Sequence, residues 1–321
     1  MTEEERGVAP LGRRLLAEFF GTALLVGVGA GAAAVLSMGT QRSLSAISDR
    51  LPAAAEDPVL NELFKGGFGD ALPVAFAFAF VLAVLVYAFG GTSGGHFNPA
   101  VTLALAATRR FSWGNLLPYC GVQVAGGIAG ALVIAGIYGE AAATAGSPDV
   151  LLGATRVSSD VTMLGAILAE AFVTFVLVTA IMAVAVDARA PKGFSGLVIG
   201  IALGAGILAT GAATGGSANF ARSLGPLVAS LLYDTDALPW KDLIVYAAGP
   251  ALGALGAAFM YESVAGLERV APAPRPGAAT PSAAAAVTGA DETPAATAET
   301  AAPVVAEEER SAQGDEEGWR P

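Results

Sequence analysis

The chain has 321 residues, of which 54% are hydrophobic and only 14% are charged, and its mean hydropathy is +0.62. Few water-soluble folds tolerate this balance, so the composition favours an integral membrane protein, and we expect no nucleic-acid partner. Much of the net charge of −11 lies in the C-terminal tail, because the chain from Val270 onward holds three Arg and nine Asp or Glu residues.

Six apolar runs are long enough to cross a bilayer, which requires about 20 residues in a helix. None of them alternates hydrophobic and polar residues with a period of two, which argues against a β-barrel. The sequence therefore predicts an all-α membrane protein with six transmembrane helices. The predicted spans are roughly 15–36, 71–90, 114–138, 162–186, 195–212 and 242–264.

The positions of the basic residues predict the orientation. They precede the first span, follow the first short Gly-rich segment, lie between spans four and five, and follow the last span. Basic residues gather on the cytoplasmic side of a membrane protein. We therefore expect a multi-pass protein of the cell membrane with both termini in the cytoplasm. The residues concerned are Arg13, Arg14, Arg109, Arg110, Arg189, Lys192, Arg269 and Arg275.

Two short Gly-rich segments, 94–101 and 215–222, interrupt the apolar pattern. Each is too short to span a bilayer, and each contains an Asn followed by a helix-forming run, which predicts a helix with Asn98 or Asn219 as its N-cap. A helix that begins inside a membrane must hide its unpaired N–H groups in protein or in a wet cavity. Two such helices predict a binding site or pore near the midplane.

The chain is an internal duplication. The pattern Ala-Glu-x-Phe-x-Thr-x-x-Leu occurs at 17–25 and again at 169–177. Because each repeat holds three spans, the second enters the membrane from the opposite side, so the two repeats are inverted. The predicted organisation is a cytoplasmic N-terminus (1–13), a channel domain (14–265) with repeats at 14–140 and 161–265 and an external insertion at 37–70, and a disordered acidic tail (266–321).

Three buried polar residues are further candidates. Glu18 and Glu170 are ionisable residues inside apolar spans, which marks them as functional candidates. They could relay protons or bind a coupling cation, or they could accept backbone N–H groups of the nearby loops. Their symmetric placement favours the acceptor role. His96 could sense pH, but we favour a neutral residue that hydrogen-bonds the loop backbone.

These patterns resemble the major intrinsic protein family, the aquaporins and glycerol facilitators, and are closer to the aquaporin branch. The resemblance rests on the duplicated Glu-x-x-x-Thr, on Ser-Gly-Gly-His-Phe-Asn-Pro-Ala-Val-Thr at 93–102, and on Asn-x-Ala-Arg-Ser-x-Gly-Pro at 219–226. It covers roughly residues 14–265 and implies a homotetramer in the lipid bilayer, with one pore in each protomer. It also implies that water and small neutral solutes are the partners and that no cofactor or metal is bound.

The resemblance also implies two sets of pore residues. The first lies at the midplane: Asn98, Pro99, Ala100, Asn219, Phe220 and Ala221. The second forms the selectivity constriction: Phe78, Ile207, Gly216 and Arg222.

This chain departs from the family pattern at several of these positions. Strict water channels carry His where Ile207 stands and usually Cys or Thr where Gly216 stands, so we expect a wider and less polar constriction. Glycerol facilitators usually carry Trp where Phe78 stands and Asp where Ser223 stands. Phe220 replaces the usual Pro at the first position of the second half-helix, where Pro suits the backbone.

We therefore expect a passive channel for water, with small uncharged solutes as further candidates, that excludes protons and ions. One alternative is a facilitator mainly for glycerol or another small polyol. Another is an ion- or proton-coupled transporter, which would have to use Glu18 or Glu170. No Ser/His/Asp set, metal cluster or phosphate-binding loop is evident in the sequence, so we do not expect an enzyme.

Overall fold

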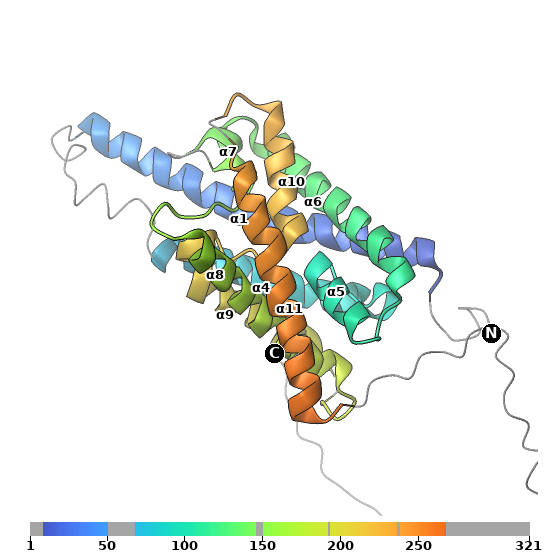
Figure 1. Ribbon diagram of the computed structural model, residues 1–321. Helices are drawn as coiled ribbons and strands as arrows, with labels where there is room; N and C mark the ends of the chain where they lie inside the picture. Colours follow the sequence, from blue (N-terminus) through green and yellow to red (C-terminus); the bar gives the residue numbers. More distant parts are fainter. Residues whose placement is uncertain (1–8, 51–67, 146–149, 192, 236–237, 268–321) are drawn as a thin grey trace, which may run out of the picture. The chain divides into compact units, whose positions relative to one another are not determined.

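The computed structural model describes residues 9–50, 68–145, 150–191, 193–235 and 238–267 (Figure 1). Within these ranges six helices are long and apolar enough to cross a membrane. They are α1 (Leu11–Arg50), α4 (Phe68–Ser93), α6 (Leu116–Tyr138), α8 (Met163–Ile181), α9 (Ser195–Thr214) and α11 (Leu243–Ala265). Two shorter helices, α5 (Pro99–Ala107) and α10 (Phe220–Ala229), follow α4 and α9.

Short turns complete the described elements. A π-helical turn, η4 (Met182–Val186), extends α8. The connection between α6 and α8 contains α7 (Ala141–Thr144) and the 3-10 turn η3 (Leu151–Gly153). Further 3-10 turns precede α6, follow α10 and precede α11; they are η2 (Trp113–Asn115), η5 (Ser230–Leu232) and η6 (Trp240–Asp242).

The six predicted spans and the two short helices are confirmed. The last five spans agree with α4, α6, α8 with η4, α9 and α11 to within three residues at each end. This agreement follows from the physics of the bilayer, where a chain must satisfy its backbone hydrogen bonds internally, so that a long apolar run in a chain of this kind forms a helix.

The first span is longer than predicted, and the external insertion does not begin as a loop. Residues 37–50, which we expected to leave the helix, continue α1 as far as Arg50. The reason is that hydropathy marks where a helix leaves the lipid, not where it ends, and no Pro occurs between Pro10 and Pro52 to interrupt the helix. At about 1.5 Å per residue a helix of this length exceeds a hydrocarbon core of about 30 Å. Residues 51–67 of the predicted insertion and nearly all of the tail (266–321) lie outside the described residues.

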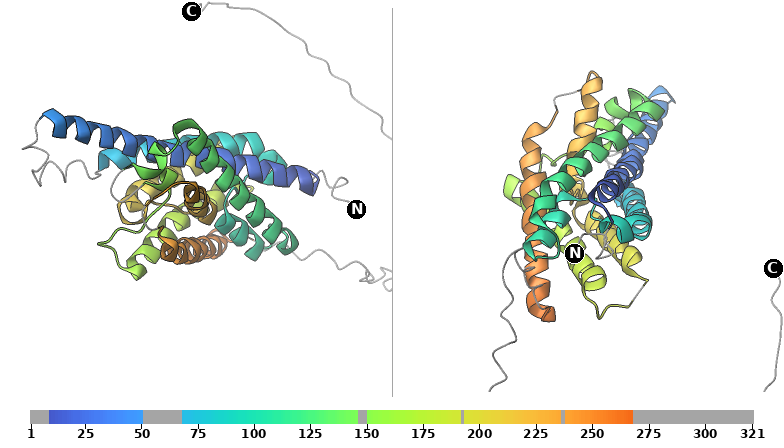
Figure 2. Two further views of the ribbon diagram at one scale, coloured as in Figure 1. Left: turned by 90° about the horizontal axis from the view of Figure 1, so that it is seen from above. Right: turned by 90° about the vertical axis from the view of Figure 1, so that its right-hand side faces the viewer.

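The helices pack as two equivalent sets. In the first half α1 packs against α4 and α6, and in the second half α8 packs in the same way against α9 and α11. The halves meet where α4 packs against α9. Each short helix also crosses to the other half, because α5 packs against α11 and α10 packs against α6 (Figure 1). The left view of Figure 2 shows α1 and α11 on opposite sides of the helices between them.

Glycines allow these helices to approach closely. A Cβ atom on Gly200 of α9 would lie 2.2 Å from the carbonyl oxygen of Ala79 on α4. A Cβ atom on Gly253 of α11 would lie 2.0 Å from the carbonyl oxygen of Ala171 on α8. Small residues at helix interfaces let backbones approach in membranes, where no hydrophobic force draws helices together. Gly200 and Gly253 are therefore packing residues at these two helix interfaces.

This packing predicts that Gly253→Ala destabilises the fold. The added methyl group would overlap a backbone carbonyl, and overpacking of a close-packed core costs about 1–3 kcal/mol. The matched control is Gly136→Ala on α6, whose added Cβ atom would meet nothing within 4 Å. Thermal unfolding of the purified protein in detergent, followed by circular dichroism, should show a lower midpoint for Gly253→Ala only. Equal midpoints for the two variants would contradict the prediction.

Candidate functional site

The two short helices meet at their N-termini and are linked through their capping residues. Asn98 caps α5, where its Oδ1 accepts the backbone N–H of Ala100 at 2.9 Å. Its Nδ2 donates to the carbonyl oxygen of Ala218, in the loop before the other short helix, at 2.7 Å. One of the two hydrogens on this nitrogen is thereby used, and the second is left for another acceptor.

Asn219 has the same arrangement from the opposite side. Its Oδ1 accepts the backbone N–H groups of Ala221 at 3.0 Å and Arg222 at 3.3 Å, so it caps α10 although Phe220 replaces Pro. Its Nδ2 donates to the carbonyl oxygen of Phe97 at 2.8 Å. The two links are reciprocal, and they hold the tips of the half-helices against each other.

Glu18 holds the loop that precedes α5. Its Oε1 accepts the Ser93 hydroxyl at 2.7 Å and the backbone N–H of His96 at 3.0 Å. Its Oε2 accepts the backbone N–H of Phe97 at 2.7 Å and the Gln123 side-chain amide at 2.8 Å. This carboxylate is completely buried. It satisfies backbone donors for which a membrane interior offers no water.

Glu170 does the same for the loop before α10. Its Oε1 accepts the Thr214 hydroxyl at 2.6 Å and the backbone N–H of Ser217 at 2.9 Å. Its Oε2 accepts the backbone N–H of Ala218 at 2.8 Å. The contacts of both carboxylates match the acceptor role that the sequence favoured.

The two loops share an unusual backbone. Phe97 and Ala218 both have left-handed φ angles, 48° and 55°, and each immediately precedes a capping Asn. For residues other than Gly such conformations cost roughly 1–3 kcal/mol and persist only where the surroundings hold them. In each loop the backbone N–H of this residue donates to a buried carboxylate, so the strain and its compensation are found at the same position.

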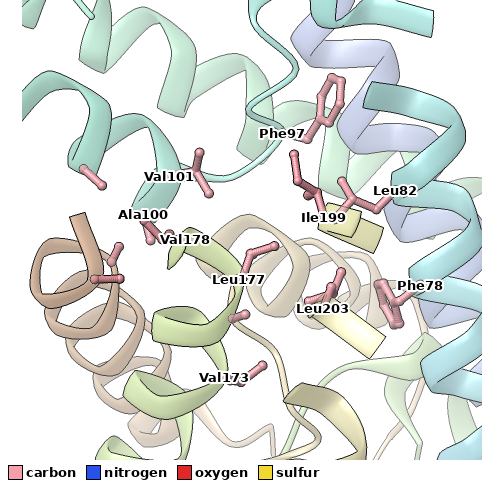
Figure 3. Close-up of a cluster of buried hydrophobic side chains, with 14 of the residues drawn as sticks. Phe78, Leu82, Phe97, Ala100, Val101, Val173, Leu177, Val178, Ile199 and Leu203 are labelled. Atoms are coloured by element: carbon pink, nitrogen blue, oxygen red, sulfur yellow. The ribbon is translucent and has the colours of Figure 1, made fainter. Parts of the chain in front are cut away.

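A narrow cavity runs past the two capping residues. Its volume is about 50 Å³. A cavity needs a volume of roughly 10–15 Å³ to hold one water molecule, so a short file of waters fits in this one. Its wall is mostly apolar and includes Phe78, Leu82, Leu177, Ile199 and Leu203, whose side chains are labelled in the buried cluster of Figure 3. Its polar lining residues are His96, Asn98, Ser217, Asn219 and Arg222.

A wider cavity of about 660 Å³ lies beyond Arg222. Its lining includes Ile207, Thr155 and Arg156, and Arg222 lines both cavities. Arg222 therefore stands at the junction between the narrow and the wide space. Neither Glu18 nor Glu170 lines either cavity.

Three of the four predicted constriction residues line these cavities. The Arg222 guanidinium lies 4.8 Å from the centre of the Phe78 ring, which is within the range of a cation–π contact. Ile207 lines the outer cavity, and Gly216 is packed so closely against it that a Cβ atom on Gly216 would lie 3.0 Å from the Ile207 Cα. Gly216 itself does not line a cavity, whereas its neighbour Gly215 does.

The remaining predicted midplane residues lie in the first turns of α5 and α10. Ala100 and Ala221 are buried and supply backbone N–H groups to the capping side chains. Pro99 and Phe220 are the first residues of α5 and α10, and neither lines either cavity.

His96 is packed differently from the prediction. Its Nδ1 lies 3.2 Å from the hydroxyl oxygen of Thr102 on α5, so the ring has a side chain as its hydrogen-bond partner where the prediction had the loop backbone. The ring also packs against Phe111 and Tyr119, with centroid distances of 4.9 and 5.3 Å. The guanidinium of Arg14 lies over the same two aromatic rings.

The sequence interpretation missed the connection between α6 and α8. There the Gly153 carbonyl oxygen accepts Arg222 Nη1 at 2.8 Å. Thr155 is hydrogen-bonded to Ser223 at 2.6 Å, and Ser223 is hydrogen-bonded to Ser217 at 2.6 Å. No local sequence pattern marks a loop carbonyl as the partner of a distant Arg. The hydroxyl donors to Glu18 and Glu170, which are Ser93 and Thr214, could have been found from the sequence, because they are equally spaced before Asn98 and Asn219.

The contacts of Glu170 predict a graded loss of stability. In Glu170→Gln one acceptor oxygen becomes an amide, so at least one donor loses its partner, at a cost of about 1–3 kcal/mol. In Glu170→Ala all three donors lose their partner, and we expect little folded protein. Size-exclusion chromatography and thermal unfolding in detergent measure both effects. Wild-type stability in Glu170→Ala would contradict the acceptor role.

The comparisons with known proteins agree with this architecture. The model of the family described as "Major intrinsic protein" matches residues 7–261. The probable aquaporin AqpM of Archaeoglobus fulgidus is 39% identical over 260 residues, which are 79% of this chain and 98% of the relative. Aquaporin AqpM of Methanothermobacter marburgensis is 38% identical over 253 residues, which are 78% of this chain and 97% of the relative.

A solved structure shows the same fold. The aquaglyceroporin from Plasmodium falciparum has a TM-score of 0.62 and 22% sequence identity, and the match covers 80% of this chain and 97% of that one. Together with the two inverted halves and the linked half-helices, the family match and the two relatives lead to one conclusion. The chain belongs to the major intrinsic protein family.

Proposed function

We propose that this protein is a passive transmembrane channel that conducts water and small uncharged solutes and excludes protons and ions. The observation that carries this proposal is the narrow cavity lined by both Asn98 and Asn219. The relatives named aquaporin support water as the first substrate.

The linked Asn residues provide the means to exclude protons. Each side-chain amide retains one hydrogen after its link to the opposite loop, and both residues line the narrow cavity. A water whose oxygen accepts these two donors points its own hydrogens away along the cavity. Proton hopping needs a continuous, equally oriented file, so it is interrupted there. The positive ends of the two half-helices, at the same place, disfavour cations.

Arg222 supplies the second barrier. It stands at the junction of the two cavities, and its fixed charge repels cations while its N–H groups bind passing oxygen atoms. Two apolar side chains line the cavities that meet at Arg222: Phe78 in the narrow cavity and Ile207 in the wide one. This combination favours small neutral molecules with a hydrogen-bonding side and an apolar side. A channel mainly for glycerol or another small polyol is therefore the second candidate function.

Coupled transport is less well supported. Both candidate carboxylates are fully buried and bound to loop donors, away from either cavity. Among the described residues no group of three or more His, Cys, Asp or Glu side chains could hold a metal ion. We propose no catalytic activity and no cofactor.

We also propose a cellular location and an oligomeric state for the channel. The basic residues support a cell-membrane protein with both termini in the cytoplasm. Family resemblance supports a homotetramer with one pore in each protomer. The exposed large apolar side chains of α1, α4, α8 and α9 suit a surface that faces lipid or neighbouring protomers.

Stopped-flow light scattering on liposomes that contain the full chain tests the function. Faster osmotic shrinkage than in empty liposomes is expected, and glycerol re-swelling above the same background would establish the broader specificity. A pH-sensitive dye inside the liposomes should report no added proton leak. Shrinkage at the rate of empty liposomes, or a proton current, would overturn the proposal.

Arg222→Ala should widen the constriction and remove its charge. We expect glycerol flux to rise by about tenfold, the effect of roughly 1.4 kcal/mol on a barrier, and proton leak to increase. Arg156→Ala is the matched control, because Arg156 lines only the outer cavity. The same liposome assays should show a change for Arg222→Ala alone, and an equal change in both variants would argue against a barrier at Arg222.

His96 should not gate the channel. Its imidazole packs against two aromatic rings that also contact the Arg14 guanidinium, so a proton on His96 would place a second positive charge in a buried cluster. Water permeability should therefore stay constant between about pH 5.5 and 8, a range centred near the ordinary imidazole titration. His96→Ala, measured in the same buffers, should be equally flat; a wild-type step that the variant lacks would establish a pH sensor.

A further inference from the structure

A glycine on α1 receives the ring of the constriction residue Phe78. An ideal Cβ atom on Gly29 would lie 2.2 Å from Cε1 of Phe78 and 2.4 Å from Cδ1 and Cζ. Non-bonded carbon atoms prefer separations of about 3.5–4.0 Å. The ring edge therefore occupies the space that any other side chain at position 29 would need.

The face of the same ring meets the charged side of the pore. The Arg222 guanidinium lies 4.8 Å from the ring centre, and both residues line the narrow cavity. Phe78 is only 3% exposed, so apart from the side that lines the narrow cavity its ring has close neighbours. The depth to which its edge enters α1 sets how far the ring extends toward Arg222.

The second repeat shows that the helix does not by itself require a glycine at the position of Gly29. The spacing of Glu18 and Glu170 places Ile181 of α8 at the position equivalent to Gly29, and the spacing of Ser93 and Thr214 places Ile199 of α9 at the position equivalent to Phe78. Both isoleucines line the narrow cavity. The glycine occurs in the half of the chain that carries the ring.

We propose that Gly29 is a positioning residue that sets the width of the constriction by admitting the edge of the Phe78 ring into α1. A methyl group at this position displaces the ring from the helix. The surrounding interior is close-packed, so the space open to the displaced ring is the cavity itself. This inference rests on the proposed channel function, and it names a residue that selects solutes without touching them.

The test compares Gly29→Ala with Gly27→Ala in the full chain, reconstituted in liposomes. Gly27 is a matched control on the same helix, because its added Cβ atom would lie 3.7 Å from its nearest neighbour, the Gly130 carbonyl oxygen. In Gly29→Ala we expect the flux of the largest solute that the wild type conducts to fall about tenfold, as a barrier increase of roughly 1.4 kcal/mol would produce. Water flux should fall less, and Gly27→Ala should match the wild type.

A second substitution separates positioning from folding. Phe78→Leu removes the ring, so Gly29→Ala should have no further effect on the ratio of solute to water flux in the Phe78→Leu background. If Gly29→Ala fails to fold but the double variant folds, the coupling of the two residues is upheld. Two results would overturn the inference. One is an equal loss of solute and water flux in Gly29→Ala that Phe78→Leu does not relieve, and the other is failure of both Gly29→Ala and the double variant to fold.

A structural measurement distinguishes failure of this inference from failure of the proposed function. If the wild type conducts no water above empty liposomes, the channel proposal is wrong, and the inference is then judged from the structure of Gly29→Ala determined by cryo-electron microscopy. A Phe78 ring displaced toward Arg222 supports it. An unmoved ring excludes it.

Discussion

Backbone N–H groups that lie inside a membrane without a helical partner are the constraint on which this structure depends. The loops before α5 and α10 expose such groups at the depth where water is absent, and each group left unpaired there would cost several kcal/mol. Glu18 and Glu170 accept those of His96, Phe97, Ser217 and Ala218. Fixed in this way, the loops present the carbonyl oxygens to which the opposite Asn side chains donate.

The duplication explains the symmetry of this framework, and the repeats depart from symmetry at the proposed selectivity constriction. Asn98 and Asn219 stand at equivalent positions and make equivalent contacts. Three residues further on, Val101 stands where the second repeat has Arg222, and both line the narrow cavity. A charge is therefore present at one end of the pathway and an aliphatic side chain at the other. The scaffold is shared between the repeats, whereas the proposed barrier at Arg222 belongs to the second repeat alone.

The sequence predicted those features that local patterns determine. Spans follow from apolar length, the two half-helices from Asn before a helix-forming run, and the inverted repeats from an odd number of spans per repeat. The acceptor role of Glu18 and Glu170 could be favoured from their placement, but their individual partners could not be named. The predicted end of the first span was wrong because the helix continues beyond the apolar run.

Features that depend on tertiary packing were beyond reach from the sequence. The Gly153 carbonyl that holds Arg222 belongs to a connection whose path is fixed only when the helices pack. The contact of Gly29 with Phe78 joins two helices through the absence of a side chain, which leaves no local pattern. The same holds for the partner of the His96 ring, because Thr102 reaches it from the next helix.

The reciprocal links between Asn98 and Asn219 and the opposite loops have a mechanical consequence. Neither half-helix can withdraw from the midplane without breaking a hydrogen bond held by the other. The centre of the pathway is thus a fixed part, and in the proposed channel solutes would cross it without any separation of the two half-helices.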